Sequence, residues 1–217
     1  MSDWLYKISS YSLFLPILIA VYNHKYISSS LWWYFGGLLL ANLNSIISIK
    51  LSEHGINNHF MIYVSACCTM IFRTFFFYTL LKSKIYKQIL LFSLIIYLSG
   101  ICIDLYLHGI YMNQYLFLVF NIWTIIFFLV ALNQILKDES IESLREFPLF
   151  WVIIGTLIFQ IFDLLLTALN SWLYNLNRSF IFFLWDYIVP IFIFIRVIFV
   201  SIGYWKTKYY AENLANS

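Results

Sequence analysis

Residues 148–173 read PLFWVIIGTLIFQIFDLLLTALNSWL, and this stretch decides the fold. It contains a single charged side chain, Asp163. An α-helix needs about 20 apolar residues to cross a bilayer, and this run is longer. A strand of a membrane barrel would instead alternate polar and apolar side chains over about ten residues. The stretch therefore predicts a transmembrane helix.

Runs of the same kind fill most of the remaining chain. Short polar breaks such as Asn23-His24-Lys25 and Lys82-Ser83-Lys84 separate them. The six further predicted spans are Leu5–Tyr22, Leu31–Ile49, His59–Leu81, Tyr86–Tyr106, Gln114–Leu136 and Ser179–Trp205. We therefore expect an all-α, polytopic membrane protein with seven transmembrane helices, in which residues 1–217 form a single transmembrane domain.

The composition supports this class and excludes others. The 217 residues are 63% hydrophobic and only 11% charged, with a mean hydropathy of +0.84. A soluble domain has about 45–50% apolar and about 25% charged residues, so a soluble enzyme, a disordered chain and a disulfide-rich secreted domain are disfavoured. The net charge of +3 is too small to indicate nucleic-acid binding. The lipid bilayer is the first predicted partner.

The distribution of Lys and Arg predicts the orientation. Eight lie in the first, third and fifth breaks and after the last span: Lys25, Lys82, Lys84, Lys87, Lys137, Arg145, Lys206 and Lys208. Three lie on the other side, namely Lys7, Lys50 and Arg178. This bias predicts an N-terminus outside and a C-terminus in the cytoplasm. We expect Leu5–Tyr22 to be an uncleaved span, because Asn23-His24-Lys25 follows it where a signal peptide has small residues.

Two stripes of polar or small residues predict where helices meet. Thr156, Gln160, Asp163, Thr167 and Asn170 recur at spacings of four and three, which places them on one helix face. That face must turn to the bundle or to a water-filled cavity, since lipid offers no hydrogen bonds. The second stripe, Gly37, Ala41, Asn44 and Ser48, would let a neighbouring helix approach closely. With Asn42 and Asn121, the stripes suggest a polar pocket between the second, sixth and seventh spans that opens outward.

Four ionisable residues lie well inside the predicted spans, where each costs about 2.5–3.5 kcal/mol on insertion scales. They are Arg73, Asp163, Asp186 and Arg196. We expect Asp163 to pair with Arg73 or Arg196, and Asp104, near a helix end, to be solvated. The candidate ligand- or partner-binding residues are Asn44, Arg73, Asn121, Gln160, Asp163, Asp186 and Arg196. Side chains of this kind also serve simply to join helices, at about 0.6 kcal/mol per interaction.

Other sites receive little support from the residues. The histidines lie at loops or helix ends, and Cys67, Cys68 and Cys102 lie in apolar runs without the spacing of metal ligands, so we predict no metal and no cofactor. The last predicted span, Ser179–Trp205, contains no lysine, which excludes a retinal Schiff base. No nucleophile elbow or phosphate loop is present, and we predict no catalytic residue. Ser143 and Glu146 resemble a capping box before Pro148.

Short motifs resemble a group of uncharacterised seven-helix membrane proteins common in Bacteroidetes-type bacteria. They are Asn57-Asn58 with Ile62-Tyr63, then Phe150-Trp151, Ile154-Gly155 and Leu157-Ile158, and finally Gly203-Tyr204-Trp205. The resemblance extends over about a third of the chain. An acidic residue expected in the third helix of that group is replaced here by Cys67 or Cys68. The resemblance implies a location in a bacterial inner membrane. It does not indicate an activity.

The predicted function is a non-enzymatic sensory or partner-binding subunit of a membrane complex in the bacterial cytoplasmic membrane. Its partner would be another membrane protein, and its polar residues would bind a small-molecule or lipid ligand or a partner helix. Two alternatives remain open. One is a small-solute or ion transporter that uses the pocket between the second, sixth and seventh spans. The other is an intramembrane lipid hydrolase that uses Asp163 and Asp186 as an acid–base pair.

Overall fold

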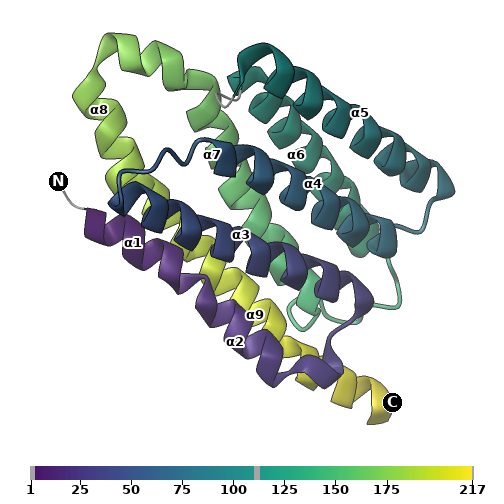
Figure 1. Ribbon diagram of the computed structural model, residues 1–217. Coiled ribbons are helices and arrows are strands. Elements are labelled where there is room, and N and C mark those ends of the chain that lie inside the picture. The colour runs from purple at the N-terminus through teal and green to yellow at the C-terminus, as the bar shows by residue number, and fades with distance from the viewer. Residues whose placement is uncertain (1–2, 110–112, 217) are drawn as a thin grey trace. The chain divides into compact units, whose positions relative to one another are not determined.

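A computed structural model describes residues 3–109 and 113–216, and this part of the chain forms helices and turns with no strand. The helices are α1 (Asp3–Ser12), α2 (Phe14–Tyr22), η1 (His24–Tyr26), α3 (Ser29–Glu53), α4 (Phe60–Leu80), α5 (Lys84–His108), α6 (Gln114–Leu136), α7 (Pro148–Leu176), α8 (Arg178–Phe183), η2 (Leu184–Ile188) and α9 (Val189–Asn216) (Figure 1). The predicted all-α class is confirmed.

Six helical stretches in the described part are long and apolar enough to cross a membrane. Five are α3, α4, α5, α6 and the part of α7 from Pro148 to Asn170, and the sixth runs from Arg178 to Asn213 through α8, η2 and α9. They indicate a multi-pass membrane protein. The first predicted span is different, because a turn at Leu13 separates α1 from α2 and its apolar part, Lys7–Tyr22, is shorter than about 20 residues. A count of seven spans and the orientation of the termini stay predictions.

The described residues divide into two compact units. The first unit contains the residues up to Ile27 and those from Asn121 onward, and the second unit contains Ser28–Phe120, so that the boundary falls within α6. In the first unit α7 lies along α9, and α1 and α2 also contact α9 (Figure 1). In the second unit α4 contacts both α3 and α5.

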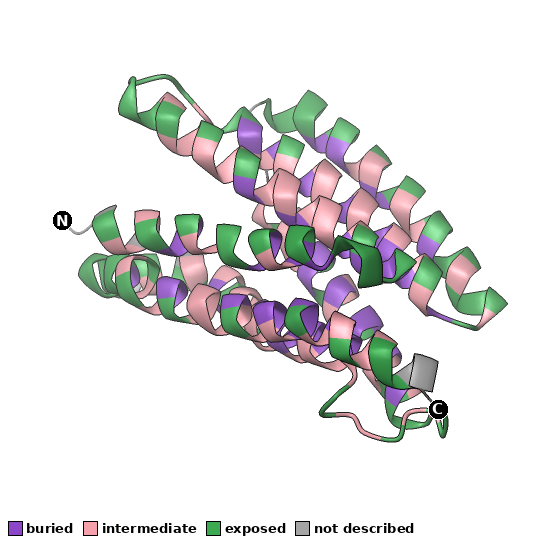
Figure 2. Ribbon diagram, turned by 90° about the horizontal axis from the view of Figure 1, so that it is seen from below, coloured by how far each residue is buried: buried purple, intermediate pink, exposed green. Residues whose placement is uncertain are grey.

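Exposed residues, green in Figure 2, are common on the long helices, and many of them are large and apolar. On α5, for example, Phe92 is 66% and Ile95 is 64% exposed. A soluble protein rarely exposes a continuous apolar surface of this kind. Lipid solvates such side chains without cost, so the exposed positions agree with the length and hydropathy of the helices.

Two glycines bring α7 and α9 of the first unit close together. A Cβ atom at Gly155 would overlap Phe199, and one at Gly203 would lie 2.6 Å from Cγ2 of Val152 and 2.9 Å from the carbonyl oxygen of Pro148. Phe162 and Phe192 stack with ring centroids 3.9 Å apart. The contacts run antiparallel, from Val152 opposite Gly203 to Phe162 opposite Phe192. This register determines which polar residues of the two helices lie at the same level.

In the second unit the predicted stripe of small residues on α3 lies against α4. A Cβ atom at Gly37 would lie 2.9 Å from Cβ of Phe72. The Nδ2 of Asn44 donates to the carbonyl oxygen of Met61 at 3.2 Å, and Ser48 accepts from Asn58 at 2.7 Å. Small side chains therefore permit the close approach of these two helices.

The predicted capping box before α7 is wrong. The backbone N–H of Glu146 donates to the carbonyl oxygen of Ser143 in a turn, and α7 begins at Pro148 with Phe147 as the N-cap and no side-chain cap. Proline fits this position because it has no N–H that would need a partner in the first turn of a helix.

Candidate functional site

Three of the predicted site residues meet in the first unit. The Nε2 of Gln160 donates to Oδ1 of Asn121 at 2.5 Å, and the Nδ2 of Asn121 donates to Oδ2 of Asp163 at 2.9 Å. Gln160 and Asn121 are each 1% exposed, whereas Asp163 is half-buried. We call these three residues the amide–carboxylate chain.

The helices explain how these residues come together. Gln160 and Asp163 lie one turn apart on α7, and Asn121 on α6 uses both ends of its amide to bridge them. Each amide donates toward the carboxylate, so the dipoles along the chain add. The arrangement fixes the orientation of a carboxylate within an apolar span, where it can accept a hydrogen bond or attract a cation.

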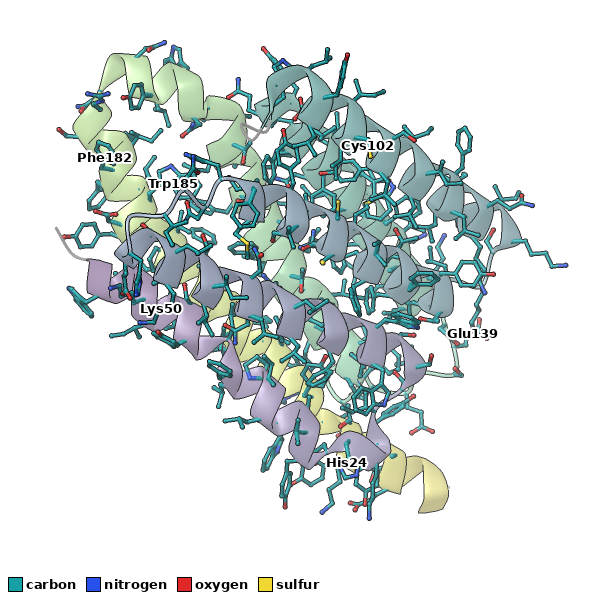
Figure 3. The ribbon with its side chains drawn as sticks, viewed as in Figure 1. His24, Lys50, Cys102, Glu139, Phe182 and Trp185 are labelled. Carbon is teal, nitrogen blue, oxygen red and sulfur yellow. The ribbon has the colours of Figure 1, made fainter. Side chains whose placement is uncertain are left out.

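The other members of the predicted stripe on α7 have different partners. Thr156 is fully buried and donates to the carbonyl oxygen of Val152 at 2.7 Å, within its own helix. Asn170 accepts from Nε1 of Trp185, labelled in Figure 3, at 3.4 Å. The periodicity therefore found the correct face, although only Gln160 and Asp163 belong to the amide–carboxylate chain.

Arg196 lies on the face of α9 that contacts α7. Its guanidinium carbon lies 5.2 Å from the ring centroid of Phe159, and its Nε is buried without a hydrogen-bond partner. Among the described residues, no carboxylate lies within ion-pair distance of Arg196. The register places Arg196 opposite Phe159 rather than opposite Asp163, which corrects the expected pairing of Asp163 with Arg196.

Asp186 lies in η2, a π-helical turn between α8 and α9, and is half-buried. The register of α7 and α9 places Asp163 opposite position 191, so Asp186 is about 7 Å nearer the α8 end along the helix axis. No hydrogen bond joins Asp186 to Asp163 in the described part of the chain. The π-turn makes η2 a candidate functional position by itself, since such turns often occur at functional sites.

The remaining predicted residues, Asn44 and Arg73, belong to the second unit. Asn44 bonds to the backbone of α4, as described above, and the guanidinium carbon of Arg73 lies 5.1 Å from the ring centroid of Phe120. The ring of Phe120 also lies 5.4 Å from that of Tyr97. The pocket predicted between the second, sixth and seventh spans and the pairing of Arg73 with Asp163 stay predictions.

The second unit also contains a cluster that the sequence interpretation missed. Asp104, expected to be solvated, is only 7% exposed. Its Oδ2 accepts from the hydroxyl of Tyr63 at 2.8 Å and from the backbone N–H of Asn113 at 3.0 Å, and its Oδ1 lies 2.8 Å from Nδ1 of His108. The spacing of Asp104 and His108, one turn apart on α5, was visible in the sequence. The contribution of Tyr63 from α4 was not.

The described residues contain no group of three or more His, Cys, Asp or Glu side chains that could hold a metal ion. Cys67, Cys68 and Cys102 have free thiols, and Cys102 is labelled in Figure 3.

Comparison with known proteins finds no matching family model, no matching curated protein and no matching solved structure.

Proposed function

We propose that this chain is a non-enzymatic sensory or partner-binding subunit of a membrane complex in a bacterial inner membrane. In this proposal α1 and α2 together form a seventh span, with the N-terminus outside. Six long apolar helices support a multi-pass protein, and the loops between them are short. Such a chain has little mass outside the bilayer, so recognition must use side chains within the spans.

The amide–carboxylate chain is the observation that carries this proposal. Gln160 and Asn121 are buried and hold Asp163, a half-buried carboxylate, in one orientation. An ionisable residue within a span is expensive and commonly marks a functional position. A carboxylate held in one orientation at a half-buried position can bind a hydroxyl, amide or basic side chain of a partner helix.

The test is gentle purification of the full chain from its native membrane, followed by mass spectrometry of the proteins that accompany it. We expect a stoichiometric membrane-protein partner, which Asp163→Asn releases while the chain itself stays folded. Glu139→Gln is the matched control, because Glu139 is exposed in the loop before α7 (Figure 3). A chain that purifies alone, or a partner that is retained by Asp163→Asn, contradicts the proposal.

The orientation is tested separately. A reporter enzyme that is active only outside the cytoplasmic membrane should be inactive when fused after the last residue. An active C-terminal fusion would show that the predicted bias of Lys and Arg does not orient this chain.

The π-turn η2 favours a second candidate, an ion transporter. Broken helices near the binding site are common in transporters, and this turn carries Asp186 between α8 and α9. After reconstitution into liposomes, proton flux driven by a potassium diffusion potential should be measurable with a pH-sensitive dye. Asp186→Asn should abolish it and Glu139→Gln should not. Equal dye signals from protein-containing and empty liposomes would remove proton transport.

A further inference from the structure

Arg196 is a cation in the middle of an apolar span. The apolar part of α7, Pro148–Asn170, has Phe159 at its centre, and the guanidinium group of Arg196 lies over the ring of Phe159. We propose that Arg196 and Phe159 form a binding site for the carboxylate of a long-chain carboxylic acid. The proposal does not depend on the partner helix suggested above.

The first argument is charge. The described residues provide no counter-ion for Arg196, and its buried Nε has no hydrogen-bond partner. A cation–π contact with Phe159 compensates only part of the cost of removing a guanidinium group from water. An anion that offers two oxygens would satisfy the planar fork of the guanidinium group.

A second arginine in the same unit shows why position matters. The guanidinium carbon of Arg178 lies 4.6 Å from the ring centroid of Tyr174, a geometry similar to that of Arg196 over Phe159. However, Arg178 is exposed at the first residue of α8, where water or lipid headgroups can solvate it. Arg196 is half-buried in the middle of the span, where neither water nor a lipid headgroup can solvate it. The guanidinium group of Arg178 is therefore solvated, whereas that of Arg196 still needs an anion.

The surroundings of Arg196 select the kind of anion. One turn away on α9 are only apolar side chains, namely Phe192, Ile193, Phe199 and Val200. Phe192 stacks on Phe162 and Phe199 contacts Trp151, so aromatic side chains lie between α7 and α9 on both sides of the arginine. The ligand must therefore have one anionic group and an apolar body.

Depth distinguishes a carboxylic acid from a phospholipid. Arg196 lies opposite the middle of the α7 span, about 16 Å along the axis from Pro148. A phospholipid headgroup remains at the membrane surface, roughly 15 Å from the centre of a core that is about 30 Å thick. A carboxylic acid has a much smaller head, and it can be neutral while it crosses apolar surroundings.

The test uses the full chain, purified in detergent and freed of lipid, and radiolabelled oleate as the probe. We expect about one oleate per chain, and Arg196→Gln should weaken binding at least about tenfold, because two charge-assisted hydrogen bonds are lost. Arg178→Gln is the matched control and should bind oleate like the unaltered chain. Oleyl alcohol, which has the same tail without the charge, should not compete.

Three results would overturn the proposal. The first is equal binding of oleate by Arg196→Gln and by the unaltered chain. The second is that oleyl alcohol competes for the site as well as unlabelled oleate does. The third is that phosphatidylglycerol binds in a way that depends on Arg196, whereas oleate does not. The last result would assign the site to a phospholipid. If Arg196→Gln does not fold, Arg196→Lys gives the answer, since a lysine keeps the charge but loses the planar fork. It should bind oleate several-fold more weakly, and unchanged binding would also overturn the proposal.

Discussion

The two carboxylates Asp104 and Asp163 both lie within apolar helices, yet their surroundings differ. Asp104 is buried and receives hydrogen bonds from a tyrosine, a histidine and a backbone N–H that belong to three different segments. Asp163 is half-buried and lies at the end of a chain of two buried amides. A carboxylate enclosed by its own donors holds segments together. A carboxylate that is partly exposed, and whose orientation buried amides hold, is suited to recognition.

The largest expected effect is at Asp104. Asp104→Asn places an NH2 group against a donor and removes the charge that strengthens three hydrogen bonds, so we expect a loss of about 2–3 kcal/mol in the free energy of unfolding. This loss is measured by unfolding the variant and the unaltered chain in mixed SDS micelles while monitoring circular dichroism. Asp163→Asn should cost less than about 1 kcal/mol in the same assay. Equal losses would break the distinction between an anchoring and a recognising carboxylate.

The next effect concerns the glycine contacts within each unit. Gly203→Ala forces α9 away from the carbonyl oxygen of Pro148, and we expect a destabilisation of about 1–2 kcal/mol. Gly100→Ala on α5 is the control, because its new methyl group would meet only Cδ1 of Leu116, at 3.4 Å. Its melting temperature in detergent should be unchanged or higher, since alanine favours a helix more than glycine does. A melting temperature of Gly203→Ala equal to that of the unaltered chain would show that α7 and α9 can separate without cost.

A smaller effect tests whether the amide–carboxylate chain acts as a unit. Gln160→Leu and Asn121→Leu, singly and together, form a double-mutant cycle. We expect a coupling free energy of about 0.6 kcal/mol, the usual size for polar contacts between membrane helices. The same cycle on Gln160 and Thr207 is the comparison, because Thr207 on α9 donates to the carbonyl oxygen of Tyr204 within its own helix, far from Gln160, and should show no coupling. Strictly additive changes for Gln160 and Asn121 would mean that their hydrogen bond contributes nothing.

The smallest effect is expected at Trp185. Its bond to Asn170 is long, 3.4 Å, and exposed. Trp185→Phe keeps the aromatic ring and loses this bond, so the unfolding free energy should change by less than about 0.5 kcal/mol. A larger loss would show that the contact between η2 and α7 is a structural anchor comparable with Asp104.

Parts of the candidate site were visible in the sequence. Spacings of three and four placed Gln160 and Asp163 on one face of α7, and small residues on α3 predicted that a neighbouring helix would approach it closely, which in the structure is α4. The partners across helices were not visible. Asn121 donates to Asp163, a contact that the sequence did not indicate, and Arg196 lies over Phe159 rather than beside Asp163 because of how α7 and α9 align. Likewise, Asp104 was expected to be solvated, since nothing in the sequence indicated that Tyr63 would reach it.

The sequence by itself determined the class of protein and the positions of the long helices. A bilayer requires about 20 apolar residues per span, and this requirement acts on each helix separately. Tertiary structure decided which polar groups meet, because that depends on the rotation and axial register of one helix against another. A shift of α9 along α7 by a single turn, about 5.4 Å, would leave every predicted span in place and give Arg196 a different neighbour.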